Sequence, residues 1–212
     1  MTNKNNIRRA ALARRDAFSS EARIEASLAL LDHADHPLLD LPGETVVAGY
    51  HPIRSEIDPR PLLDVLRRRG VRLCLPAVVS GSASDHERHR GRLEFRALER
   101  GDRREAELVS AGFGTLAPPD TAAIVTPRVL LVPLAAFDRT GGRLGYGAGH
   151  YDGALAALPD ATAIGIAFAG QEVEAVPQEP HDRRLDAILT EREVIVPRAD
   201  ATTTHEMRAA GA

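Results

Sequence analysis

A glycine-rich segment at residues 143–152 constrains the fold of this 212-residue chain more than any other feature. An apolar run at residues 129–134 lies upstream and predicts a buried strand, and residues 151–158 can begin a helix. Glycine lets the backbone turn tightly and lets a ligand approach without a Cβ in the way. The pattern therefore predicts a strand, a glycine loop and a helix in succession.

The composition of this glycine loop indicates a site for polyphosphate and its metal. The loop opens with Arg143, closes with Asp152, and carries Gly145, Gly147 and Gly149 at alternate positions. Backbone N–H groups at a helix N-terminus favour an anion. The spacing is not that of a P-loop, because no Gly-Lys-Ser/Thr follows, and it is not the dinucleotide fingerprint either. On spacing alone, an ordinary glycine-rich turn between a strand and a helix stays open as the alternative.

The rest of the chain alternates predicted helices and strands. We expect helices at 4–18, from residue 20 and from residue 58 to Gly70, and strands at 45–50, 71–77, 93–98, 163–168, 188–190 and 194–196. Ile24, Leu28 and Leu31 form one apolar stripe of the second helix. This alternation predicts a single α/β domain over residues 1–197, with a sheet covered on both faces and not purely parallel. Residues 198–212 have little apolar content and are predicted to be a disordered tail.

Composition excludes several classes of protein. A net charge of −3 and a pI near 6.2 argue against nucleic-acid binding through bulk charge. The only cysteine, Cys74, lies in an apolar run, so an intrachain disulfide and a cysteine-rich zinc site are both excluded. No apolar stretch approaches the ~20 residues of a membrane-spanning helix, and the polar, basic N-terminus lacks a signal core. We therefore expect a cytoplasmic enzyme or binding protein.

Three further segments carry residues suited to ligand binding. Lys4 and Arg8 are four residues apart and share one helix face, where two cations attract an anion, although a solvated basic face is the alternative. Glu56 follows a predicted strand, where ligands gather in open α/β sheets, and can accept hydrogen bonds from a polar ring. The segment 181–186 holds two carboxylates, one of which can join Asp152 around Mg²⁺.

With these pieces in this order, the sequence resembles the 5-formyltetrahydrofolate cyclo-ligase family. The resemblance covers nearly the whole chain up to about residue 197. Its anchors are Lys4-x-x-x-Arg8, Ser55-Glu56-Ile57-Asp58, Leu131-Val132-Pro133, Ala136-Phe137-Asp138, the glycine loop, Gln171-Glu172-Val173, His181-Asp182 and Leu185-Asp186. The central anchor, residues 132–152, is the specific one.

The resemblance implies a fold, a reaction and a set of site residues. The implied fold is a three-layer α/β/α sandwich with a central mixed, mostly parallel sheet, similar to the ribose-phosphate isomerase and CoA-transferase group. The implied reaction converts 5-formyltetrahydrofolate to 5,10-methenyltetrahydrofolate through a phosphorylated formyl intermediate, with ATP and Mg²⁺ used and ADP and phosphate released.

The resemblance assigns the family's functional roles to matched positions of this chain. The implied ATP contacts are Lys4, Arg8, Arg143, Leu144, Gly145, Tyr146, Gly147, Ala148, Gly149, His150, Tyr151 and Asp152. The implied folate contacts are His51, Glu56 and His150, and the implied magnesium carboxylates are Asp152 and Asp186. Arg143, Lys4 and Tyr151 are the residues predicted to act in catalysis.

The chain also departs from the family pattern near the loop. His150 stands where a tyrosine is usual, Ala148 where glycine or lysine is common, Gly153 where arginine is frequent, and Ala117 where a glutamate often precedes proline. A non-catalytic relative that binds folate or nucleotide is therefore the alternative function. We further expect a monomer with no nucleic-acid or membrane partner.

Overall fold

The structure, a computed structural model, describes residues 3–79, 91–98, 108–112, 114–179 and 182–197. The predicted tail at 198–212 and the anchor residue His181 lie outside these residues. Its helices are α1 (Lys4–Asp16), α2 (Ser20–Ala29), α3 (Arg60–Arg68) and α5 (His150–Ala157), with short 3₁₀ turns η1 (Leu30–His33), η2 (Pro37–Leu39) and η4 (Ala169–Gln171).

Seven strands form the main sheet, in the order β11-β10-β9-β6-β1-β2-β3. These strands are β1 (Val46–Ala48), β2 (Arg72–Val79), β3 (Arg92–Ala97), β6 (Val129–Pro133), β9 (Thr162–Ile166), β10 (Ala187–Leu189) and β11 (Val194–Ile195). Neighbours from β2 through β10 pair parallel, and the edge strands β3 and β11 pair antiparallel. The predicted mixed, mostly parallel sheet is thus confirmed.

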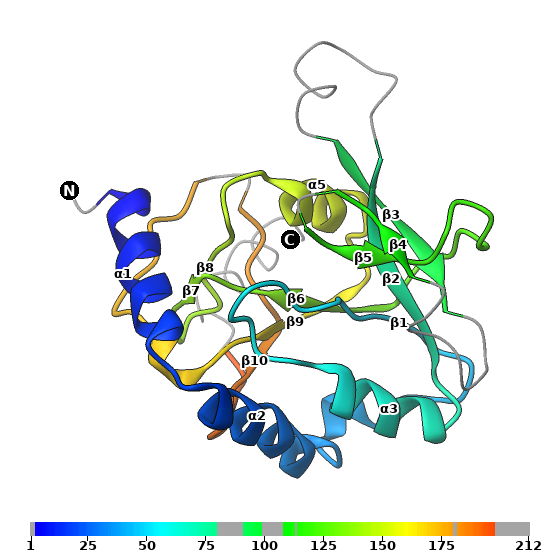
Figure 1. Ribbon diagram of the computed structural model, residues 1–212, viewed down its shortest axis with the longest axis horizontal. Helices are drawn as coiled ribbons and strands as arrows, with labels where there is room; N and C mark the ends of the chain where they lie inside the picture. The colour runs from blue at the N-terminus through cyan, green and yellow to red at the C-terminus, as the bar shows by residue number, and fades with distance from the viewer. Residues whose placement is uncertain (1–2, 80–90, 99–107, 113, 180–181, 198–212) are drawn as a thin grey trace, which may run out of the picture.

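Helices cover both faces of this sheet and give it three layers. In Figure 1, α2 and α3 lie on one side of the strands and α5 on the other, while α1 stands beside the β7–β8 end of the molecule. Alternate residues of the central strands point to opposite faces. Val47 and Leu131 join the core under α2 and α3, whereas Leu130 and Val132 join the core under α5 around Leu155.

Two small two-stranded sheets were not predicted. One joins β4 (Val109–Ser110) to β5 (Leu116–Ala117), and the other joins β7 (Ala136–Phe137) to β8 (Arg143–Leu144). The second matters for the site, because β8 holds the first two residues of the glycine loop. Two-residue strands carry too little periodicity to be recognised in a sequence.

The stripe expected on the second helix differs from what the structure shows. Ile24 is 61% exposed and Leu28 is 50% exposed, whereas the helix packs through Ala26 and, just beyond its end, Leu30. Small residues let α2 approach the core closely, so its largest side chains face outward. Among the described helices, none is long and apolar enough to cross a membrane.

The parallel strands bring the segments that carry the predicted site to one edge of the sheet. The segment 49–58 follows the carboxyl end of β1, and the β7–β8 hairpin and glycine loop follow the carboxyl end of β6, which is its neighbour. Asp58 ends the first segment, and its Oδ1 accepts a hydrogen bond from the Arg60 backbone N–H at 2.9 Å, although the N-cap residue of α3 is Pro59 and not Asp58. Residues far apart in the sequence therefore meet at this edge.

Candidate active site

A buried aspartate shapes the turn that leads into the glycine loop. Asp138 accepts hydrogen bonds from the backbone N–H groups of Thr140 and Gly142 and from the Thr140 hydroxyl. Its other oxygen accepts from the Val176 N–H at 2.7 Å, which ties the turn to a segment almost forty positions later. Burial alone would raise the pKa of Asp138, but these hydrogen bonds lower it below its usual value. The turn therefore rests on a carboxylate that stays ionised.

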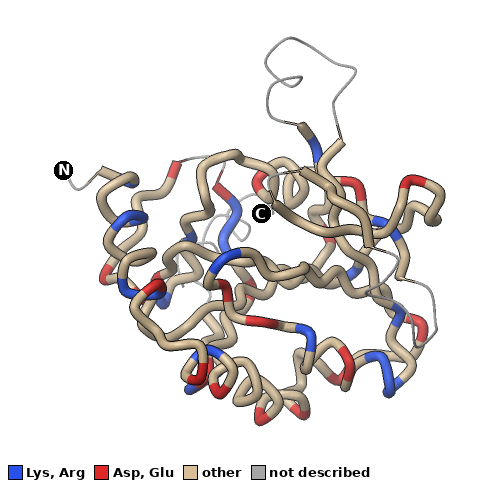
Figure 2. Tube along the Cα trace, viewed as in Figure 1, with Lys and Arg blue, Asp and Glu red and all other residues tan. Residues whose placement is uncertain are grey.

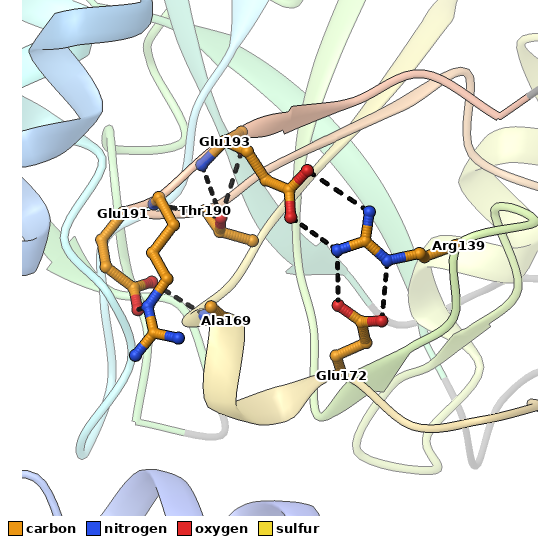
Figure 3. Close-up of polar contacts among 7 residues, drawn as sticks. Arg139, Ala169, Glu172, Thr190, Glu191 and Glu193 are labelled. Carbon is orange, nitrogen blue, oxygen red and sulfur yellow. Dashed lines mark hydrogen bonds and ion pairs between the residues drawn. The ribbon is translucent and has the colours of Figure 1, made fainter.

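An ion-pair cluster on the surface holds the other side of the same turn (Figure 3). The Arg139 guanidinium lies between two carboxylates, with Nε 2.9 Å from Glu172 and Nη2 2.5 Å from Glu193. Hydrogen bonds from Arg139 lower the pKa of Glu193. Glu191, next to this cluster, accepts from the Ala169 N–H at 2.8 Å and so fixes η4. The turn, η4 and the β10–β11 connection are thereby joined.

Arg143 is a buried cation whose hydrogen bonds are incomplete. Its side chain is only 6% exposed, and its Nη2 lies 2.6 Å from Oδ1 of Asp152 in the first turn of α5. Its Nε is buried with no hydrogen-bond partner. Burial lowers the pKa of Arg143, whereas the negative charges of Asp152 and Asp182 raise it. A guanidinium stays protonated in proteins, so the site contains a fixed positive charge with one donor unsatisfied.

The start of α1 lies against the glycine loop. Arg8 Nε donates to the Gly145 carbonyl at 2.7 Å, and a Cβ built on Gly147 would stand 3.7 Å from the Arg8 guanidinium carbon. Gly147 and Gly149 have φ of 101° and 74°, which favour glycine. Figure 2 shows Lys and Arg along α1, and the first turn has no acidic residue. Arg8 therefore lies against the glycine loop, and its contact with ATP stays a prediction.

Lys4 lies in a groove between α1 and a later segment. Its Nζ is 2.8 Å from Oε1 of Glu179 and 3.0 Å from Oδ2 of Asp182. The hydrogen bond with Glu179 is the main cause that raises the pKa of Lys4. The groove has a volume of about 690 Å³ and is lined by Asn3, Lys4, Asn5, Arg8, Pro177, Gln178 and Glu179. The two predicted cations of α1 therefore border one groove beside the loop.

Glu56 lies at the junction between the β1 segment and the glycine loop. Its Oε2 accepts from the Ile53 backbone N–H at 2.9 Å, and its carboxylate is also a hydrogen-bonding partner of the Tyr146 hydroxyl. Burial raises the pKa of Glu56, and the hydrogen bonds from Tyr146 and Ile53 oppose that rise. Arg54, two residues earlier, adopts a φ of 55°, which is uncommon for a residue other than glycine and bends the segment sharply.

The other predicted folate-facing residues lie around this junction or at the start of α5. His51 is half-buried just beyond β1. His150 begins α5, and its Nε2 is 3.9 Å from a Cβ built on Gly91, beside β3. The Tyr151 ring packs against the core under α5, and burial raises the pKa of its phenol. Tyr151 is therefore neutral near neutral pH and can donate a proton in a hydrogen bond.

The two predicted magnesium carboxylates have separate partners. Asp152 pairs with Arg143, whereas Oδ2 of Asp186 accepts from the Ala163 N–H at 2.7 Å, at the amino-terminal edge of the sheet. Asp186 also faces Arg183, which donates to the backbone carbonyls of residues 155, 158 and 161 at the end of α5. Within the described ranges, no group of three or more His, Cys, Asp or Glu side chains is arranged to hold a metal ion.

Sequence reasoning missed one residue that joins these parts. Arg15 is buried at the last turn of α1 and contacts both the β1 segment and the glycine loop. A signal for it was present, because the face that carries Lys4 and Arg8 continues at helical spacing to the fully buried Ala11 and then to Arg15.

The fold and this arrangement define an open α/β protein whose polar loops meet at the carboxyl edge of a parallel sheet, the usual place for ligands in such folds. Comparison with known proteins identifies the family within this class. The profile of the 5-formyltetrahydrofolate cyclo-ligase family matches residues 1–191. The chain belongs to this family.

Two curated relatives are similar to this chain in sequence. The chain is 36% identical over 163 residues to the 5-formyltetrahydrofolate cyclo-ligase of Mycolicibacterium smegmatis, which covers 74% of this chain and 79% of the relative. It is 33% identical over 154 residues to the Escherichia coli protein of the same name, covering 70% and 79% of the two chains.

Two solved structures are similar to this chain in fold. The 5,10-methenyltetrahydrofolate synthetase of Aquifex aeolicus superposes with a TM-score of 0.72 at 25% identity, covering 97% of this chain and 98% of that one. The synthetase of Mycoplasma pneumoniae shares the fold, with a TM-score of 0.67 at 22% identity over 90% of this chain and 99% of that one.

Proposed function

We propose that this protein is an ATP-dependent enzyme that converts 5-formyltetrahydrofolate to 5,10-methenyltetrahydrofolate and releases ADP and phosphate. Its family is the first support for this proposal. The observation that carries it is the buried Arg143 guanidinium, whose Nε has no hydrogen-bond partner. An unsatisfied buried donor is costly, and a phosphate oxygen would satisfy it once the loop moves enough to expose this atom.

The nucleotide is proposed to lie along the glycine loop, between Arg143 and the groove beside α1. Arg143 and Arg8 supply forked donors, Lys4 supplies a compact charge, and the loop supplies backbone N–H groups. No side chain caps the first turn of α5, which leaves its N–H groups available to an anion. The full set of proposed contacts is Lys4, Arg8 and residues 143–152.

Mg²⁺ is proposed to bind between the phosphates and Asp152. Magnesium in nucleotide sites is usually held by one or two carboxylates together with phosphate oxygens and water, so a small set of protein ligands suffices. Asp152 has an exposed carboxylate beside the buried Arg143, which fits such a ligand. Asp186 is the second predicted ligand, but it lies at the amino-terminal edge of the sheet and already accepts from the Ala163 N–H, so the proposed site rests on Asp152. Bound there, the ion would neutralise phosphate charge.

The folate is proposed to lie beside Glu56, with His51, His150 and Tyr151 around it. A carboxylate held by Ile53 and Tyr146 has a fixed direction and retains acceptor capacity for the N–H donors of a pterin ring. The parallel strands place this segment next to the glycine loop, so the formyl group and the terminal phosphate can meet.

For this reaction the protein has to position the two substrates and neutralise the charge of the transferring phosphoryl group. A formamide carbonyl is a poor electrophile, and its oxygen is a poor leaving group. Phosphorylation of that oxygen solves both problems, after which N10 attacks the carbon, the ring closes and phosphate leaves. Arg143 and Lys4 hold the phosphoryl charge during transfer, and Tyr151 acts as a neutral donor. No covalent intermediate with the protein is required.

Formyl-dependent ATP hydrolysis tests this function directly. Purified protein should release phosphate from ATP only when 5-formyltetrahydrofolate is present, with one methenyltetrahydrofolate formed per phosphate, measured by its near-ultraviolet absorbance. Binding of both compounds without turnover would instead identify the non-catalytic relative. Sedimentation of the active protein tests the expected monomer.

A further inference from the structure

Arg15 is a charged residue in a place where charge is costly. It lies in the last turn of α1, its side chain is 2% exposed, and it is among the largest fully buried side chains of the described residues. A buried charge is costly unless it is paired and hydrogen-bonded, so the partners of a buried arginine indicate its task. Its neighbour Arg14 is exposed and donates to backbone carbonyls of residues 170 and 172. The two adjacent arginines thus have different tasks.

The partners of Arg15 belong to the two segments that form the proposed site. Its Nε donates to the Ser55 hydroxyl at 3.0 Å, and its Nη1 donates to the Tyr146 hydroxyl. Its Nη2 lies 3.6 Å from Oδ1 of Asp16, which also accepts from the Ser55 hydroxyl. One guanidinium therefore connects Ser55, the residue before Glu56, with Tyr146 of the glycine loop.

The direction of these hydrogen bonds follows from the donors available. A guanidinium only donates, so the Tyr146 oxygen must accept from Arg15. The single phenolic proton of Tyr146 is then directed to its other partner, the Glu56 carboxylate. Oε2 of Glu56 also accepts a hydrogen bond from the Ile53 N–H at 2.9 Å. Arg15, Tyr146 and Glu56 therefore form one ordered chain of hydrogen bonds.

We propose that Arg15 is a positioning residue that acts through Tyr146 and Ser55 to fix the Glu56 carboxylate in the direction and charge state that bind the folate. This inference rests on the proposed folate-binding role of Glu56. It assigns to the glycine loop a second task, because Tyr146 reaches from that loop to the folate side.

The charge environment of Glu56 gives the proposal a pH signature. The ionisable groups that face Glu56 are Arg15, Arg54, Tyr50, Tyr146 and Tyr151. Burial raises the pKa of Glu56, while Tyr146 and the two arginines lower it. Removing Arg15 or the Tyr146 hydroxyl should therefore raise this pKa further. Folate binding that needs the ionised carboxylate would then be lost at a higher pH than in the parent protein.

The test compares Arg15→Gln and Tyr146→Phe with Arg14→Gln, a change of the neighbouring arginine on the same helix. The dissociation constant for 5-formyltetrahydrofolate is measured without ATP from about pH 5 to pH 8, where a raised carboxyl titrates. Loss of a residue that orients a binding group typically weakens binding roughly 10- to 100-fold. We expect this loss in Arg15→Gln and Tyr146→Phe, with the acid limb displaced to higher pH, and parent behaviour in Arg14→Gln.

Two further variants separate positioning from simple stabilisation. Arg15→Lys keeps the charge and should restore much of the parent pH profile. The double variant Arg15→Gln/Tyr146→Phe should be little worse than either single one, because both changes break one chain. Tyr146→Phe keeps the ring and preserves the test if Arg15→Gln does not fold.

The outcomes distinguish this inference from the proposed function. If the parent protein shows no formyl-dependent ATP hydrolysis, the proposed function fails. If the parent is active, but Arg15→Gln and Tyr146→Phe keep the parent affinity and pH profile and lose only melting temperature, Arg15 is structural and the inference is overturned.

Discussion

Replacing Arg143 with methionine should separate activity from stability. Methionine retains much of the side-chain volume but removes a buried charge whose Nε has no partner. An unsatisfied buried donor costs about 1–3 kcal/mol. The ion pair with Asp152 involves a carboxylate that is 45% exposed, so its loss costs about 0–1 kcal/mol. Arg143→Met should therefore be at least as stable as the parent, by up to about 3 kcal/mol.

The turnover of Arg143→Met should fall, although its stability should not. Charge stabilisation of a transferring phosphoryl group is typically worth about 3–4 kcal/mol, which is roughly 100- to 1000-fold in rate. The melting temperature should stay level or rise by up to about 12 °C, because 1 kcal/mol corresponds to about 2–4 °C in a protein of this size. Methenyltetrahydrofolate formation, followed by near-ultraviolet absorbance, gives the rate, and calorimetry gives the melting temperature.

Two controls sharpen the result. Arg128→Met changes an exposed arginine just before β6 and should leave both readings unchanged. Arg143→Lys keeps a charge but not the planar fork, so it should keep some nucleotide binding and lose turnover. If Arg143→Lys turned over within about threefold of the parent, or if Arg143→Met melted well below it, Arg143 would be a structural cation and the phosphoryl-transfer role would move elsewhere.

Three other expectations concern the glycine loop and the two predicted magnesium carboxylates. Arg8→Ala should raise the Michaelis constant for ATP about tenfold, because its guanidinium lies over the glycine loop, and a value equal to the parent's would make it a solvated cation. Gly147→Ala should lower the free energy of unfolding by about 1–2 kcal/mol and weaken ATP binding, because the φ of Gly147 is 101°. Gly153→Ala should leave both quantities unchanged, because a Cβ at Gly153 would meet open space. Asp152→Asn and Asp186→Asn should both raise the magnesium concentration needed for half-maximal turnover; an Asp186 variant that only melted earlier would restrict the metal site to Asp152.

The sheet and its helices were predictable because each long element has its own local pattern. The strands β2, β6 and β9 and the helix α1 fall within one or two residues of the expected ranges at most ends. The direction of most strand pairs followed from the helices between them. The order of strands in the sheet was not predictable, since it depends on which apolar faces pack together and not on any single segment.

The contacts within the candidate site were predictable only in part. Lys4, Arg8 and Arg143 were found through their motifs, and Arg8 does reach the glycine loop. The burial of Arg15 was missed, because a charged residue at a helix end is ordinarily solvated and its partners are 40 and 131 residues away in the chain. The exposed Ile24 and Leu28 show the converse failure, in which periodicity was present but smaller residues made the contact.

The cations of this site are held in place by other groups of the protein before any ligand binds. Lys4 contacts Glu179 and Asp182, Arg143 contacts Asp152, and Arg8 donates to a backbone carbonyl. These partners fix long, flexible side chains, which lowers the entropy cost of arranging them around a polyphosphate. They also offset the local positive charge, which agrees with a net charge of −3 for a chain whose first helix is strongly basic. A polyphosphate must compete with these carboxylates, whereas the buried Nε of Arg143 has no partner to displace, so a loop movement that exposed it would add a hydrogen bond without breaking one.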